Sequence, residues 1–160
     1  MSEETGLDAI DKRILQAMQA QGRITYDDLA SLVGLSGSAA LRRVRRLEEA
    51  GVITGYGARI DPQRVGLALT AYLSVRLAKH APGDPRSPTD AFAAAVQSWP
   101  EVVECAALTG EMDYLLRVMV RDIEHCSRFI MDTLLRHPAV QDCKTSFVLR
   151  QFKGPQALPL

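Results

Sequence analysis

The stretch YDDLASLVGLSGSAALRRVRRL, residues 26–47, decides the fold of the first part of the chain. Two short helical patterns meet here at a tight turn. Gly34 can take the left-handed conformation that ends a helix, and Ser36 can cap the next helix by accepting a bond from a free backbone N–H. A helix, a glycine-containing turn and a second helix form the pattern of a helix-turn-helix motif.

The second helix of this motif is predicted to have one apolar and one basic face. At 100° per residue, Leu41, Val44 and Leu47 form an apolar stripe. Residues 36–47 contain four arginines and no acidic residue. Arginines on a helix are often only a solvated surface, but an acid-free basic face beside this turn favours binding of double-stranded DNA. The residues opposite the apolar stripe are Ser38, Ala39, Arg42, Arg45 and Arg46, with Arg43 at the border.

The position of these residues along the helix predicts their roles. The first residues of a recognition helix normally meet base edges in the major groove. We therefore expect four residues to read sequence, namely Ser36, Ser38, Ala39 and Arg42. Arg43, Arg45 and Arg46 lie further along and are expected to contact phosphates.

The composition excludes several other classes of protein. Lys and Arg number 19, as do Asp and Glu, so any nucleic-acid footprint is local. The odd number of cysteines, three without a C-x-x-C motif, fits a reducing cytoplasm. His125 and Cys126 would point about 100° apart on a helix, so we expect no metal site and no cofactor. The polar N-terminus is not a signal peptide, and no apolar run approaches the ~20 residues that span a membrane.

Residues 1–51 are predicted to form a three-helix DNA-binding domain. The first helix runs from Leu7 to Gln21, with Asp8 as its N-cap and Asp11 in a capping-box position. Thr25 with Asp28 is expected to cap the second helix in the same way. Residues 52–66 are predicted to be a linker strand and hinge. Strand-forming residues run from Val52 to Ile60, and Asp61-Pro62 and Gly66 follow.

Residues 67–160 are predicted to form a second domain. Apolar and polar residues alternate over residues 67–77, which indicates a strand. A helix follows Thr89, two strands span residues 102–109 and 113–121, a helix follows Asp122, and the last strand spans residues 140–152. The order βαββαβ predicts a ferredoxin-like sheet with helices on one face. An apolar second face would best be covered by another copy of the chain, so we expect a dimer.

Three segments together resemble the Lrp/AsnC family of transcription regulators. They are LDAIDKRILQAMQAQGRITYDDLASLVGLS (7–36), RRVRRLEEAGVITGYGARIDPQRVG (42–66) and LTGEMDYLL (108–116). The resemblance implies an N-terminal DNA-binding domain, a linker strand and a C-terminal regulatory domain in an α+β fold. It also implies homodimers that often assemble to octamers, many of which sense amino acids. The chain departs from the family at Gly37, Ala39 and Ala40, where Pro commonly follows the capping Ser, and this leaves the operator sequence open.

The loop Thr109–Asp113 is a simple β-turn on its local sequence, with Gly110 supplying a positive φ. A catalytic role for Glu111 with Asp113 lacks a nearby histidine or nucleophile, so we expect no enzyme. The resemblance implies instead that this loop lines an amino-acid effector site at a subunit interface. The N–H groups around Gly110, Glu111 and Met112 would hold a carboxylate, and Asp113 would pair with an ammonium group.

The function expected from these features is a sequence-specific DNA-binding transcriptional regulator whose assembly and DNA occupancy respond to a small amino acid. Two alternatives stay open. One is a DNA-architectural protein without a small effector, and the other is a small-molecule enzyme built on the ferredoxin-like half.

Overall fold

The computed structural model describes residues 6–79 and 87–160, which form two compact units. The helical unit comprises the described residues up to Arg59 together with Lys153–Leu160. The sheet unit comprises the described residues of Ile60–Phe152. The division therefore falls inside the predicted linker, and residues 153–160 join the helical unit instead of the second domain in which they were expected.

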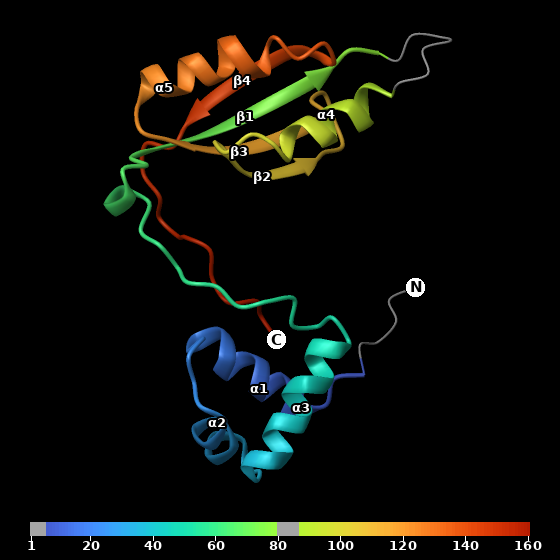
Figure 1. The fold of residues 1–160 in the computed structure, drawn as a ribbon, viewed down its shortest axis with the longest axis vertical. Helices are drawn as coiled ribbons and strands as arrows, with labels where there is room; N and C mark the ends of the chain where they lie inside the picture. The colour runs from blue at the N-terminus through green and yellow to red at the C-terminus, as the bar shows by residue number, and fades with distance from the viewer. Residues whose placement is uncertain (1–5, 80–86) are drawn as a thin grey trace. The chain divides into compact units, whose positions relative to one another are not determined.

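Three helices build the helical unit (Figure 1): α1 Ala9–Ala20, α2 Tyr26–Val33 and α3 Gly37–Glu49. Each begins at its predicted cap, where a side-chain oxygen accepts a hydrogen bond from the backbone N–H three residues on; the caps are Asp8, Thr25 and Ser36. Asp11 completes the predicted capping box by accepting a bond from the Asp8 N–H at 3.2 Å. Caps of this kind each contribute about 1 kcal/mol to stability.

The core of the helical unit lies between the apolar faces of the three helices. On α3, Ala40 is fully buried, whereas Leu41, predicted to face inward, is only half-buried. The helix is thus turned slightly from the predicted orientation, because positions i, i+4 and i+7 define its inner face. The buried side chains at the centre are Ile14, Leu15, Leu29, Val33, Val44 and Leu47.

The linker does not form the predicted strand. The Ile53 N–H donates to the Leu47 carbonyl at 3.1 Å, but residues 54–60 make no backbone hydrogen bond within the part of the chain that the structure describes. A strand needs a neighbour that pairs its N–H and C=O groups, and the described residues of the helical unit supply none. Gly55 and Gly57 further disfavour a regular strand. The predicted linker strand is therefore wrong for the single chain.

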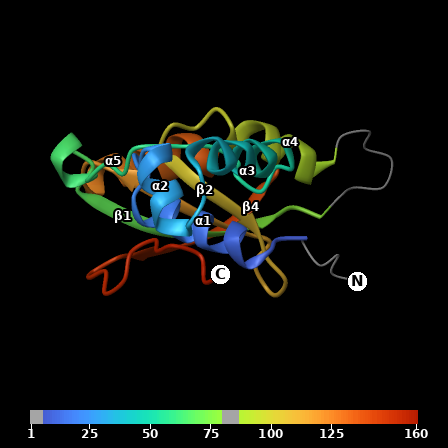
Figure 2. The same ribbon diagram turned by 90° about the horizontal axis from the view of Figure 1, so that it is seen from below.

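The C-terminal segment lies beside α1 in both views (Figures 1 and 2). The Gln19 side chain accepts from the Leu158 N–H at 2.6 Å and donates to the Leu158 carbonyl at 3.4 Å. Gln16 donates to the Leu160 carbonyl at 3.0 Å. This segment and the linker line a groove of about 610 Å³ on α1. The segment follows a last strand that ends at Phe147, earlier than the predicted residue 152.

The sheet unit contains one antiparallel sheet in the order β2-β3-β1-β4. Its strands are β1 Leu69–Leu77, β2 Val102–Ala107, β3 Tyr114–Val120 and β4 Val140–Phe147. Helix α4, Pro88–Val96, connects β1 to β2, and α5, Ile123–Arg128, continues into the π-helical turn η2, Phe129–Leu134, before β4. A short 3-10 helix, η1, Gln63–Val65, precedes β1. The predicted ferredoxin-like βαββαβ order is confirmed.

The helices of the sheet unit cover one face of the sheet. Phe92 of α4 lies against Trp99 and Tyr114, with ring centroids 5.7 and 5.0 Å away. Ile123, the first residue of α5, is 66% exposed and does not contribute to this core. The buried residues of this core are Ala71, Leu73, Val75, Leu77, Phe92, Val96, Leu116, Val118, Val120, Cys126, Phe129, Leu134 and Ala139.

The other face of the sheet is not purely apolar. Tyr72 is 37% exposed there, and Arg117 pairs with Glu104 at 3.2 Å across β2 and β3. Arg76 lies on the same side as Tyr72, since the two positions differ by an even number along β1. The open face of the sheet is therefore mixed polar and apolar, whereas the expected dimer was to cover an apolar face.

Candidate DNA-binding surface and effector loop

The turn between α2 and α3 is set by three local features of the chain. Gly34 ends α2 in the left-handed conformation with φ +76°. The Leu35 N–H then donates to the Ala30 carbonyl at 2.9 Å, and Ser36 caps α3 by accepting from the Ala39 N–H at 3.3 Å. These short-range bonds fix the direction in which α3 leaves the turn.

The outer face of α3 brings together most of the residues predicted to contact DNA. Ser38, Arg42 and Arg45 are exposed at i, i+4 and i+7, so they form one stripe along the helix. The Ser36 hydroxyl lies 3.2 Å from that of Ser38 at the start of this stripe. Ala39 is half-buried beside it. A shallow hollow of about 420 Å³ runs along the stripe, lined by Ser38, Leu41, Arg42, Arg45, Arg46 and Glu49.

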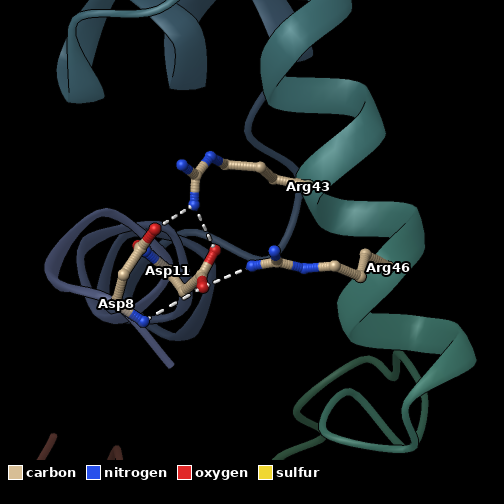
Figure 3. A network of polar contacts seen from close by, with 4 residues as sticks. All are labelled: Asp8, Asp11, Arg43 and Arg46. Carbon is tan, nitrogen blue, oxygen red and sulfur yellow. Dashed lines mark hydrogen bonds and ion pairs between the residues drawn. The ribbon is translucent and has the colours of Figure 1, made fainter. Parts of the chain in front are cut away.

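Arg43 and Arg46 take a different direction, toward α1 (Figure 3). Arg43 Nη1 donates to Asp8 Oδ2 at 2.6 Å and to Asp11 Oδ1 at 2.9 Å. Arg46 Nη2 donates to Asp11 Oδ2 at 2.5 Å. Both guanidinium groups, which we expected to contact phosphates, thus have carboxylate partners inside the helical unit.

These ion pairs change the titration of their members. The Asp11 backbone N–H and the Arg43 guanidinium hold the pKa of the Asp8 carboxyl below its usual value. The same network, through Asp8 first and then Asp11, raises the pKa of the Arg43 guanidinium. The charges on Asp8 and Arg43 therefore persist across the neutral range.

Asp11 is the important residue that the sequence analysis missed, because its side chain was assigned only to the helix cap. Its side chain is completely buried. A signal was present: two acids at spacing i, i+3 on the first helix match two arginines at spacing i, i+3 on the third, Asp8 and Asp11 with Arg43 and Arg46. Such matched spacing lets two helices exchange ion pairs across one turn.

Gly37, where the chain departs from the family pattern, lies at the first position of α3. A Cβ at this position would come within 2.8 Å of the Asp27 carboxylate Oδ1. The small residue therefore lets the Asp27 side chain of α2 lie close to the start of α3, next to the residues predicted to read bases.

The loop Thr109–Asp113 connects β2 to β3 and is closed by backbone hydrogen bonds. The Leu108 N–H donates to the Asp113 carbonyl at 2.8 Å, and the Asp113 N–H donates to the Val75 carbonyl at 2.9 Å. Gly110 has the predicted positive φ, +128°. Within the described residues, the N–H groups of Gly110, Glu111 and Met112 donate no hydrogen bond, so they are available to an anion.

Two acidic side chains of this loop already have partners in the single chain. Glu111 Oε1 accepts from Arg76 Nη2 at 2.7 Å and from Lys144 Nζ at 3.1 Å, and Lys144 and then Arg76 lower the pKa of the Glu111 carboxyl. Asp113 Oδ2 accepts from the Leu77 N–H at 2.7 Å. The loop is therefore tied to β1 and β4 through its side chains.

Comparison with known proteins assigns both parts of the chain. A family model described as the Lrp/AsnC ligand binding domain matches residues 70–158, more than half of the chain. The chain belongs to the Lrp/AsnC family. A second model, for a winged helix-turn-helix DNA-binding domain, matches residues 7–54 of this Lrp/AsnC protein. The protein is thus a DNA-binding transcriptional regulator with a ligand-binding domain.

The similarity to named relatives extends over nearly the whole chain. The Lrp/AsnC protein is 41% identical over 154 residues to the Bkd operon transcriptional regulator of Pseudomonas aeruginosa, covering 96% of this chain and 98% of that one. It is 39% identical over 152 residues to the leucine-responsive regulatory protein of Salmonella typhimurium, covering 95% and 90%. Both relatives bear the names of regulatory proteins.

Solved structures show the same fold. A transcriptional regulator of Neisseria meningitidis, solved in complex with L-Met, is similar to this Lrp/AsnC protein with a TM-score of 0.90 and 44% identity, over 96% of each chain. AsnC of E. coli matches with a TM-score of 0.81 and 25% identity, over 94% of this chain and 97% of its own. Among the described residues, no helix is long and apolar enough to cross a membrane.

Proposed function

We propose that this regulator reads duplex DNA with the outer stripe of α3. The observation that carries the proposal is the exposure of Ser38, Arg42 and Arg45 on one side of α3, while the opposite side is buried in the core. Base edges would be read by Ser36, Ser38, Ala39 and Arg42, which occupy the first turns of the helix. Arg45 would contact phosphate. Arg43 and Arg46, because of their carboxylate partners, would orient the helix.

The experiment that tests this proposal is selection from a random duplex library with the full-length protein, followed by binding of the selected duplex to single variants. Arg42→Ala should reduce affinity for the selected duplex by about tenfold to hundredfold, equivalent to roughly 1–3 kcal/mol for one lost base contact. Arg45→Ala should weaken selected and random duplexes alike. An Arg42→Ala variant that selects the same sequence with equal affinity would remove Arg42 from the reading face.

We further propose that the loop Thr109–Asp113 takes part in binding a free amino acid. Its unpaired N–H groups would receive the ligand carboxylate, and Gly110 would permit close approach because it has no Cβ. The Asp113 Oδ1 oxygen, which accepts no hydrogen bond from the described residues, would receive the ammonium group. The Neisseria meningitidis relative in complex with L-Met supports an amino acid as the ligand.

A thermal-shift screen of the twenty amino acids and common 2-oxo acids identifies the ligand. A ligand that binds only the folded state raises the melting temperature, and the rise grows with the logarithm of the ligand concentration above Kd. We expect L-Met or L-Leu among the compounds that produce a shift. If no amino acid or oxo acid shifts the transition, the loop is a plain turn.

The regulator is also proposed to act as a homodimer that assembles further, to an octamer. The backbone of residues 54–60, which lacks hydrogen-bond partners in the described chain, offers an edge for a second copy. Ile60 in this segment and Leu149 and Phe152 after β4 are apolar and exposed. A two-fold dimer would present two α3 helices to a near-palindromic site. Sedimentation equilibrium at micromolar concentration tests this, and a stable folded monomer would exclude it.

A further inference from the structure

The buried carboxylate of Asp11 accepts hydrogen bonds from the guanidinium groups of two arginines of α3. Asp11 is 0% exposed, and both of its oxygens accept hydrogen bonds from guanidinium groups, Arg43 at 2.9 Å and Arg46 at 2.5 Å (Figure 3). Oδ2 also accepts the Asp8 N–H at 3.2 Å. A buried charge is costly unless it is paired and hydrogen-bonded, and here it is both. Loss of both arginines would therefore leave the Asp11 charge buried without a cationic partner.

The two contacts restrain α3 in two ways, in its distance from α1 and in its rotation about its own axis. Arg43 and Arg46 are three residues apart, about one turn of α3, and both side chains reach one carboxylate of α1. Two tethers separated along a helix restrain its rotation about its own axis as well as its separation from the neighbour. Rotation of α3 decides where Arg42 and Arg45 point, because each is adjacent in sequence to a tethered arginine and lies about 100° around the helix from it.

The network also changes the charge that α3 offers to DNA. Residues 36–47 contain four arginines and no acid, which suggests four cationic contacts. Asp11 lies against two of these arginines, and Asp8 lies against Arg43 as well. Arg46 lines the same hollow as Arg42 and Arg45 but is paired with Asp11, whereas Arg42 and Arg45 have no carboxylate partner among the described residues. Each phosphate that a protein neutralises adds about 0.9 to the slope of log affinity against log salt concentration.

We propose that Asp11 is a positioning residue for specificity: it withholds Arg43 and Arg46 from the phosphate backbone and sets the rotation of α3, so that base contacts outweigh non-specific attraction. This inference rests on the proposed reading of DNA by α3. Asp11 itself touches no DNA in this account. Its removal should therefore strengthen non-specific binding while it weakens discrimination, a combination that simple loss of stability does not produce.

The test uses the full-length protein with two duplexes, the one selected from a random library by the wild type and a pool of random sequence of equal length. Affinities are measured by fluorescence anisotropy over a series of KCl concentrations. Asp11→Asn should keep the shape of the side chain and remove its charge. We expect the salt slope on the random pool to rise by about one to two units. The ratio of selected to random affinity should fall at least tenfold.

A matched pair of arginine variants tests the same inference if Asp11→Asn does not fold. Arg45→Gln and Arg46→Gln make the same change at neighbouring positions, and the Arg46 side chain is itself 56% exposed. Arg45→Gln should lower the salt slope by about one unit. Arg46→Gln should leave the slope unchanged and lower the ratio of selected to random affinity, since it removes one tether of α3.

The outcomes separate this inference from the proposed DNA face. If Arg46→Gln lowers the slope as much as Arg45→Gln does, Arg46 contacts phosphate and Asp11 does not withhold it. A folded Asp11→Asn variant with unchanged slope and ratio would also overturn the inference. If Arg42→Ala and Arg45→Gln both leave DNA binding unchanged, the proposed reading face itself is wrong, and the role of Asp11 falls with it.

Discussion

Glu111 in the effector loop and Arg76 in β1 form an ion pair of 2.7 Å, and Lys144 of β4 joins them at 3.1 Å. The two cations lower the pKa of the Glu111 carboxyl. A carboxyl whose pKa is lower in the folded than in the unfolded state stabilises the fold above the unfolded value, about 4.3 for glutamate. That contribution is lost as the pH falls through the lowered folded value.

The first prediction concerns this pH dependence. Glu111→Gln should lower the stability of the sheet unit slightly at pH 7, and the difference from wild type should shrink as the pH falls below about 4. The fluorescence of the only tryptophan, Trp99, reports unfolding of the sheet unit, because Trp99 packs against its core. A difference that stays constant from pH 7 to pH 3 would show that the ion pair does not stabilise the loop.

A variant that removes only the charge of Asp113 should affect ligand binding without affecting folding. Asp113→Asn keeps a side-chain oxygen for the Leu77 N–H but removes the charge. We expect the Trp99 unfolding transition to change little. Calorimetry with the amino acid found in the screen should show a loss of roughly tenfold to hundredfold in affinity, as for a charge-assisted bond of about 1.5–3 kcal/mol. Equal affinities of the variant and the wild type would remove Asp113 from the site.

Asp113→Ala is the matching control for the structural role of this side chain. It removes the acceptor of the Leu77 N–H, which is part-buried at the end of β1. The cost should be about 1–3 kcal/mol of unfolding free energy, seen in the Trp99 transition. If both variants unfold like the wild type, the hydrogen bond to Leu77 does not anchor the loop.

Two glycines beside α3 should respond in opposite directions to the same substitution. Gly37 is the first residue of α3, and among the described residues the only neighbour within 4 Å of an added Cβ is the end of the Asp27 side chain, which can move. Gly37→Ala should therefore stabilise the helical unit by about 0.5–1 kcal/mol. Gly34 has φ +76°, so Gly34→Ala should destabilise it by about 1 kcal/mol. Urea unfolding followed by circular dichroism at 222 nm measures both, and a destabilised Gly37→Ala variant would contradict the account of Asp27.

Local sequence rules predicted much of the fold. The caps Asp8, Thr25 and Ser36, the left-handed Gly34 and the order of strands and helices were all predictable, because each depends on neighbours within a few residues or on a clear period. The prediction of a linker strand was wrong because strand pairing depends on a partner that is distant in sequence. Residues rich in strand formers do not make a strand unless a partner pairs with them, and no other described residue pairs with the backbone of residues 54–60.

For the candidate site too, features that depend on local spacing were predictable and features that depend on packing between distant segments were not. Exposure of Ser38, Arg42 and Arg45 follows from helical spacing. The burial of Asp11 against Arg43 and Arg46 does not, because it depends on how α1 and α3 pack, which the sequence of one helix does not specify. The ion pairs of Glu111 could not be predicted for the same reason, since Arg76 and Lys144 come from two other strands.

The most direct test of DNA reading by α3 is the salt dependence of duplex binding by the double variant Arg42→Ala, Arg45→Ala. Arg136→Ala is a suitable control, because Arg136 is exposed in the sheet unit and pairs with Asp132 at 3.0 Å. Reading of DNA by α3 predicts that the double variant loses its preference for the selected duplex and that its salt slope falls by about one to two units, while the control matches wild type. Unchanged affinity and slope in the double variant would contradict it.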